Sequence, residues 1–94
     1  MGKIELGWEW DGNGEPPAVR VHWDDTQSYP KWKSVKKAFE LEAGHVVTVG
    51  FLLEWTERVV RVSGSYTTDG GLVDAVGNTD VIPTGWVRLV EALQ

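Results

Sequence analysis

The chain has 94 residues, no cysteine and a formal net charge of −5. This length supports one domain with a small core, and the lack of cysteine excludes disulfides, thiolate catalysis and cysteine-ligated zinc. The acidic balance opposes nonspecific binding to nucleic acid, because such binding depends on neutralising phosphates. We find no signal-peptide pattern at the start of the chain, and no apolar stretch approaches the ~20 residues of a membrane span. We therefore expect a cytoplasmic protein without membrane contact.

The first predicted element is a β-hairpin that pairs residues 3–10 with residues 18–23. Apolar and polar residues alternate along its first strand, which places four apolar side chains on one face: Ile4, Leu6, Trp8 and Trp10. The sequence DGNG at residues 11–14 favours a tight turn, and the two prolines at 16–17 widen it. The apolar face needs a cover, either the chain's own barrel or a second copy in an oligomer.

A short helix is predicted over roughly residues 30–40. Pro30 suits a first helical turn, and apolar residues recur there at helical spacing: Trp32, Val35, Ala38 and Phe39. The remaining chain reads as strands at 45–55, 58–66, 80–82 and 86–93, with a loop at 67–71 and either a short strand or an extended loop at 72–76. In the first of these strands every odd position from 47 to 55 is apolar.

Several short strands and one helix predict a mainly β fold, a small closed barrel of the SH3-like or Sm-like kind with an N-terminal β-hairpin. The sequence VIPTGWVRL at residues 81–89 resembles the end of SH3-like barrels. This resemblance implies a single helical turn before the last strand. The acidic aromatic motif and the paired tryptophan of peptide-binding SH3 domains are missing, so a proline-rich ligand is not implied. We interpret residues 1–94 as a single domain, with residues 1–17 as a hairpin extension to a barrel core at 18–94.

A second resemblance spans roughly residues 19–93. Its motifs are V-x-W-x-D at residues 21–25, VGxLL at residues 49–53 and IPxxW-V at residues 82–87. They resemble a group of small uncharacterised proteins encoded in bacteriophage and prophage genomes. The resemblance implies a phage-linked origin and supplies no activity. Trp8 and Trp10 lie outside this shared pattern.

Catalytic and metal-binding chemistry is not expected. His22 and His45 are far apart in sequence, and no serine lies in a nucleophile-elbow pattern. The acidic loop residues between 69 and 80 lack the ligand spacing of an EF-hand, and the glycine pairs are too short to cradle a phosphate. We predict a protein that is not an enzyme and uses no cofactor or metal.

The clearest polar signal is a group of four lysines around Trp32: Lys31, Lys33, Lys36 and Lys37. One interpretation is a solvated helix face whose charge is balanced by Glu40 and Glu42; another is a patch for an anion. Trp32 is expected to anchor the helix to the core rather than to stack on a ligand. The candidate binding residues are Trp8, Trp10, Trp32, Lys33, Lys36 and Lys37.

Two functions remain as hypotheses. The first is a non-enzymatic, phage-linked binding protein that sequesters or inhibits a factor in the host bacterial cytoplasm, such as a defence protein or its nucleotide signal. Its partner would be a host protein or a small anionic ligand. The second is an Sm-like nucleic-acid-binding module that uses the lysine-rich helix, which the acidic net charge disfavours.

Overall fold

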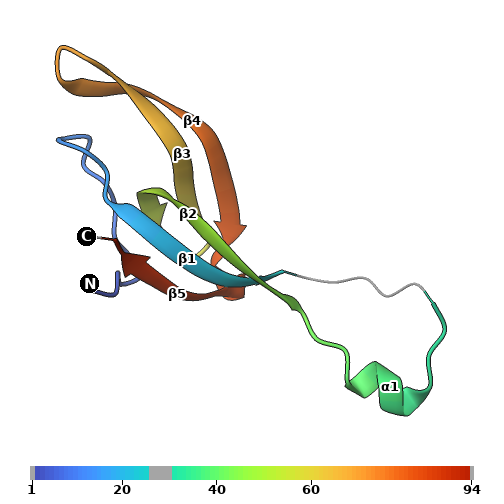
Figure 1. The fold of residues 1–94 in the computed structure, drawn as a ribbon. Helices are drawn as coiled ribbons and strands as arrows, with labels where there is room; N and C mark the ends of the chain where they lie inside the picture. The colour runs from blue at the N-terminus through green and yellow to red at the C-terminus, as the bar shows by residue number, and fades with distance from the viewer. Residues whose placement is uncertain (1, 26–30, 94) are drawn as a thin grey trace.

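The computed structural model describes residues 2–25 and 31–93, and its main feature is one five-stranded antiparallel sheet (Figure 1). The strands are β1 (Ala18–Asp25), β2 (Gly44–Trp55), β3 (Val59–Asp69), β4 (Leu72–Pro83) and β5 (Val87–Ala92), in the order β4-β3-β2-β1-β5. Helix α1 (Val35–Phe39) lies between β1 and β2, and one 3-10 turn, η1 (Thr84–Trp86), joins β4 to β5. The predicted mainly β class is confirmed. The arrangement is consistent with a small barrel-like fold, but the sheet is not closed.

Strand β2 takes part in both halves of the sheet. Residues 44–51 pair with β1, and the last part of the strand, from Phe51 onward, pairs with β3. Gly50 lies where the partner changes, and a Cβ at this position would lie 2.8 Å from the backbone oxygen of Ser63. Because that oxygen cannot swing away like a side chain, the close approach of β2 to β3 requires glycine here.

The core consists of aliphatic side chains on one face of this sheet. Seven of them are at most 3% exposed: Val19, Val21, Leu52, Val60, Val62, Ile82 and Val90. The alternation predicted for residues 18–23 is confirmed, since Val19 and Val21 are buried and Trp23 packs against the core, whereas Arg20 and His22 between them are polar and only partly buried. Burying each such side chain stabilises the fold by about 1.5–3 kcal/mol.

The first half of β2 departs from its apolar pattern. Val47 and Val49 are 45% and 61% exposed, whereas Gly50 and Leu52 are buried. The register with β1 explains this, because Val21 lies opposite Thr48 and pairs on one face of a sheet point the same way. The run of apolar odd positions therefore does not mark the core face here.

Strands β3 and β4 form a longer hairpin than the sequence predicts. Gly70 and Gly71 both have positive φ, at 61° and 83°, as a two-residue type I′ turn requires. The predicted loop at 67–71 is wrong for residues 67–69. Of the two alternatives for residues 72–76 the strand is the observed one, and it is continuous with the predicted strand at 80–82. Residues 77–79, between the two predicted segments, are also in the strand, because Gly77 pairs with Ser65 of β3 and Thr79 pairs with Ser63.

The corner before the last strand is confirmed. Strand β4 ends at Pro83, which cannot donate a ladder hydrogen bond, and η1 follows at once. The turn brings Trp86 onto Trp23 of β1, with ring centroids 6.2 Å apart in a stacked arrangement. The Trp23 indole N–H donates to the Thr48 hydroxyl at 3.0 Å, so its polar end is satisfied.

The predicted hairpin between residues 3–10 and 18–23 is wrong. Strand β1 is paired with β2 on one side and β5 on the other, which leaves no side for the N-terminal segment. The segment instead bridges two other strands, with Lys3 opposite Glu91 of β5 and Glu9 opposite Glu54 of β2. A hairpin needs a strand edge that is not already paired, and both edges of β1 are paired.

The N-terminal segment also breaks its own alternation. Trp8 N–H donates to the Glu5 carbonyl at 3.3 Å, and Gly7 between them has a φ of 98°, which closes a tight turn. Ile4 and Trp8 pack against the core, whereas Leu6 is 53% exposed. The four apolar residues predicted on one face are therefore divided between the core and the surface.

Candidate functional site

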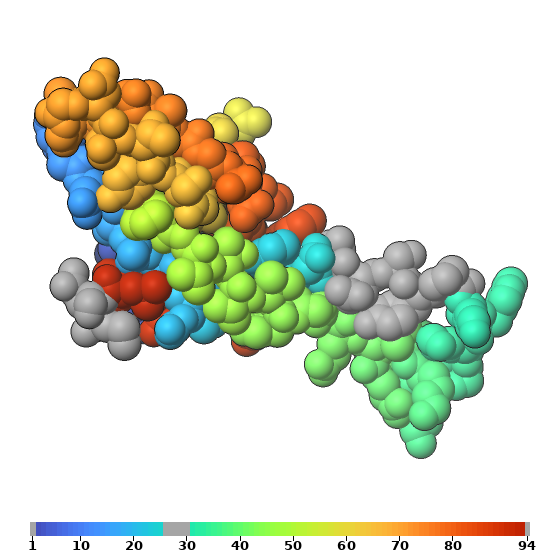
Figure 2. Space-filling view, turned by 45° about the horizontal axis from the view of Figure 1, so that its top comes forward, coloured from blue at the N-terminus to red at the C-terminus, as the bar shows by residue number. Residues whose placement is uncertain are grey.

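Residues 31–43, between β1 and β2, form a projecting segment that we call the arm (Figure 1). Every residue of the arm is exposed. We call the other described residues, 2–25 and 44–93, the body; in Figure 2 the arm forms a lobe at one end of the molecule, beyond the strands of the body. The molecule measures 60 × 24 × 23 Å along its principal axes. Its long dimension exceeds the length of any strand in the sheet, because the arm extends it.

Helix α1 is much shorter than the helix predicted at 30–40. It has five residues, and Ser34 caps its N-terminus, with the side-chain oxygen accepting from Lys37 N–H at 3.2 Å. Pro30, on which the predicted start depended, lies outside the described residues. A helix this short is marginal in water without tertiary packing, and none of its residues is buried.

The apolar side chains of the arm are uncovered. Trp32 is 101% exposed, Phe39 is 87% exposed and Val35 is 73% exposed. The prediction that Trp32 anchors the helix to the core is therefore wrong, because the arm leads the helix away from the inner face of the sheet. Large apolar side chains gathered on a projecting segment are typical of surfaces that bind another molecule.

The four lysines of the arm surround these apolar residues. With Glu40 and Glu42 they give the arm a formal charge of +2, in a chain whose total is −5. The Lys37 ammonium lies 3.8 Å from the Glu40 carboxylate, and both side chains are largely exposed. Such a pair contributes little to stability, so Lys37 remains available to an external anion.

Of the predicted binding residues, the structure brings together those on the arm: Trp32, Lys33, Lys36 and Lys37. Trp8 and Trp10 lie on the body instead, where their backbones hydrogen-bond to Trp55 and Leu53 at the end of β2. Trp8 packs against the chain's own core, and the Trp10 indole N–H donates to the Asn13 carbonyl at 3.2 Å. Both tryptophans are half-buried within the chain itself. The six residues do not form one site.

The sequence prediction missed a polar cluster on the outer face of the sheet. His22 Nε2 lies 2.7 Å from Glu91 Oε1, and the rings of His22 and His45 are 5.7 Å apart. The pairing of β1 with both β2 and β5 creates this cluster. The polar even positions of the predicted strand at 18–23 were the available signal, but they did not reveal the partners.

Opposite charges balance one another in this cluster. The hydrogen bond from His22 holds the pKa of Glu91 below its ordinary value, and the Arg20 guanidinium, 3.6 Å away, acts in the same direction. Asp24 lies 3.6 Å from Arg88 and 3.8 Å from His45. No group of three or more metal-ligating side chains gathers among residues 2–25 and 31–93. The contacts of the cluster connect β1 to β5, through His22–Glu91 and Asp24–Arg88, and β1 to β2, through Asp24–His45.

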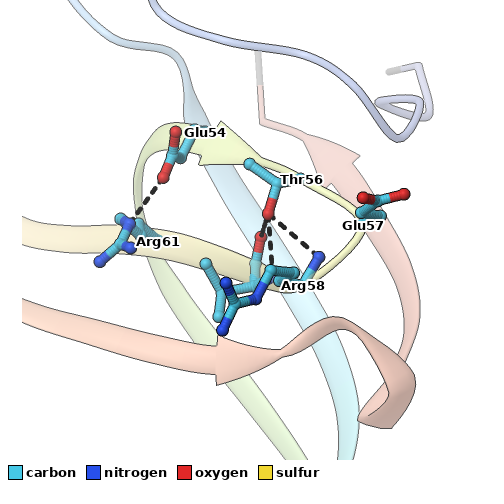
Figure 3. A pocket seen from close by; sticks show the side chains of 6 residues that line it. Glu54, Thr56, Glu57, Arg58 and Arg61 are labelled. Carbon is cyan, nitrogen blue, oxygen red and sulfur yellow. Dashed lines mark hydrogen bonds and ion pairs between the residues drawn. The ribbon is translucent and has the colours of Figure 1, made fainter.

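A hollow of about 380 Å³ lies beside the turn between β2 and β3 (Figure 3). The Thr56 hydroxyl accepts from the backbone N–H groups of Arg58 and Val59, each at 3.1 Å, and stabilises the turn. Arg61 Nε donates to Glu54 Oε1 at 2.6 Å across the same hollow (Figure 3). These contacts join residues of the β2–β3 hairpin to one another and hold the turn in place.

Comparison of the chain with protein-family models, with curated proteins and with solved structures finds no match. Within the described part of the chain, no helix combines the length and the apolar character of a bilayer-spanning segment.

Proposed function

We propose that the chain is a non-enzymatic binding protein that captures a protein partner through the arm. The observation that supports this proposal is the exposure of Trp32, Val35 and Phe39 on a segment that contributes no buried residue to the fold. Leaving such side chains in water forgoes about 1.5–3 kcal/mol each, which a partner can recover on binding. Tryptophan is also among the residues that most often dominate binding energy at interfaces.

The partner fits an acidic protein with an apolar groove. Val35 and Phe39 are four residues apart on α1, so their side chains share one face, as in helices that insert one face into a groove. Trp32 lies just before this helix, outside regular secondary structure. The lysines beside them would meet acidic groups at the rim of the groove, which raises the rate of encounter and selects against basic partners. The phage-like motifs of the sequence suggest that this partner is a host factor, which the protein sequesters in the host cell.

The test compares two variants in capture from a bacterial lysate. In the arm variant, Trp32→Ser and Phe39→Ser remove the two aromatic side chains. In the control, Leu72→Ser removes a side chain that is 63% exposed at the tip of the β3–β4 hairpin, away from the arm. We expect a host protein that the wild type and the control retain and the arm variant loses. Equal retention by all three chains would contradict the proposal.

The nucleic-acid hypothesis gives a different result in a parallel measurement. The exposed sequence Lys31-Trp32-Lys33 could neutralise phosphates and stack on a base. Binding of a fluorescent single-stranded RNA at low salt, which weakens steeply as salt is added and is lost in the arm variant, would support that hypothesis. We expect no such binding, because the chain as a whole is acidic.

A further inference from the structure

The charge of the arm changes sign along its length. Lys31 and Lys33 precede α1, whereas Glu40 and Glu42 follow it. Apolar side chains accompany both ends, because Trp32 lies among the lysines and Leu41, which is 37% exposed, lies between the two glutamates. A segment with this pattern is complementary to itself when two copies run antiparallel, because each basic end then meets an acidic end.

We infer that the arm binds the arm of a second copy of this chain. A two-fold axis between residues 36 and 37 would place Lys33 opposite Glu40 of the other copy and Lys31 opposite its Glu42. The same axis would set Trp32 against Leu41, so that apolar side chains also meet. This contact is isologous, which is the commonest arrangement in homo-oligomers. It can be measured without any other partner and does not rest on the proposed function.

The shape of the molecule allows this contact. The arm projects from the body and every one of its residues is exposed, so a second copy can reach it (Figure 2). The Lys37–Glu40 pair within the arm is weak enough to exchange for contacts with that copy. Antiparallel arms would hold the two bodies at opposite ends of the dimer. Charge repulsion between the acidic bodies would then act across more than the screening length of about 10 Å at 0.1 M salt.

The dimer should be weak, and a competing partner should shift the equilibrium towards the monomer. The arm is short, so the contact falls below the 1,200–2,000 Å² of standard stable interfaces, and we expect a dissociation constant on the order of micromolar or weaker. Lys36 and Lys37 would lie near the axis and repel their counterparts. A partner that takes the same apolar side chains would compete with dimerisation, so that binding and self-association exclude one another.

Sedimentation velocity of the full chain, from roughly 10 µM to 1 mM, tests the inference. We expect the wild type to shift from monomer to dimer across this range. The charge-reversed variants Lys31→Glu/Lys33→Glu and Glu40→Lys/Glu42→Lys should each remain monomeric, because like charges then meet. An equimolar mixture of the two variants should dimerise again. The variant Lys36→Glu should tighten the dimer several-fold, because it replaces repulsion at the axis with attraction.

Several outcomes would overturn the inference. These are a wild type that stays monomeric up to the highest concentration, a dimer that survives Trp32→Ser/Phe39→Ser, or a mixture of charge-reversed variants that stays monomeric. Circular dichroism of each variant confirms that the body remains folded. A monomeric wild type that still captures a host protein through Trp32 and Phe39 would overturn dimerisation alone, whereas an arm-dependent dimer without capture would contradict the proposed function alone.

Discussion

The body buries a set of apolar side chains, whereas the arm buries none. In the body, seven aliphatic side chains are at most 3% exposed. In the arm, Trp32, Val35 and Phe39 are uncovered, although they are as apolar as the residues of the core. Stability therefore resides in the body, and the apolar residues of the arm need another explanation, which binding supplies. This division can be tested by substitutions made in matched pairs.

The largest difference is expected between Leu52→Ala and Phe39→Ala. Leu52 is fully buried, so its truncation should lower the free energy of unfolding by about 2–5 kcal/mol. Phe39 is 87% exposed, and its truncation should change the same quantity by less than about 0.5 kcal/mol. Urea denaturation followed by tryptophan fluorescence measures both. A large loss in Phe39→Ala would show that the arm packs against the body in solution.

The close approach of β2 to β3 gives a second, smaller contrast. In Gly50→Ala the new methyl group would lie 2.8 Å from the Ser63 backbone oxygen, and the forced shift should cost about 1–3 kcal/mol. Gly85→Ala is the control, because no atom outside its chain neighbours lies within 4 Å of that position. The melting temperatures of both variants, measured by thermal unfolding, test this difference. Equal melting temperatures would mean that the two strands separate more easily than their geometry indicates.

Acidification should weaken the body through Glu91. The pKa of Glu91 in the folded state is lowered, so its ionised form stabilises the fold above the ordinary glutamate pKa. That contribution is lost as the pH falls through the folded-state pKa. Glu91→Gln should therefore lower the melting temperature at neutral pH and have little effect in acid. Melts between about pH 3 and pH 7 measure this, with Glu57→Gln, exposed on the β2–β3 turn, as the control.

The smallest effect on stability is expected in the arm itself. Replacing Trp32, Val35 and Phe39 together by serine should leave the free energy of unfolding within about 0.5 kcal/mol per site of the wild type. The reason is that none of the three is buried. Differential scanning calorimetry measures the change. Loss of the cooperative transition would contradict the separation of body and arm.

The strands of the body could be predicted where a local pattern coincided with the final pairing. The alternation in β1 placed Val19 and Val21 correctly in the core, and Pro83 marked the end of β4. The N-terminal hairpin failed because ladder partners are chosen across the whole fold. Residues 3–10 had a strand pattern, but β2 and β5 occupied both sides of β1.

The residue types of the candidate site could be predicted from the sequence, but their exposure and their neighbours in the fold could not. Helical spacing from Trp32 to Phe39 indicated an amphipathic segment, but spacing does not say what covers the apolar face. The cluster of His22 and Glu91 joins residues 69 positions apart, and only the register of β1 with β5 brings them together. The spacing of residues in the sequence does not predict the register between two strands that are far apart in the chain.

The pairing of β1 with β5 also governs how the chain folds. Strand β1 lies between β2 and β5 in the sheet, but β5 is the last strand to be synthesised. To pair β1 with β5, the chain between them must first close into a loop, which costs conformational entropy before any stabilising contact forms. Such long-range pairings place β proteins among the slower two-state folders. On the ribosome, β1 therefore waits with one edge unpaired until β5 emerges, while the arm, which needs no partner strand, is already accessible.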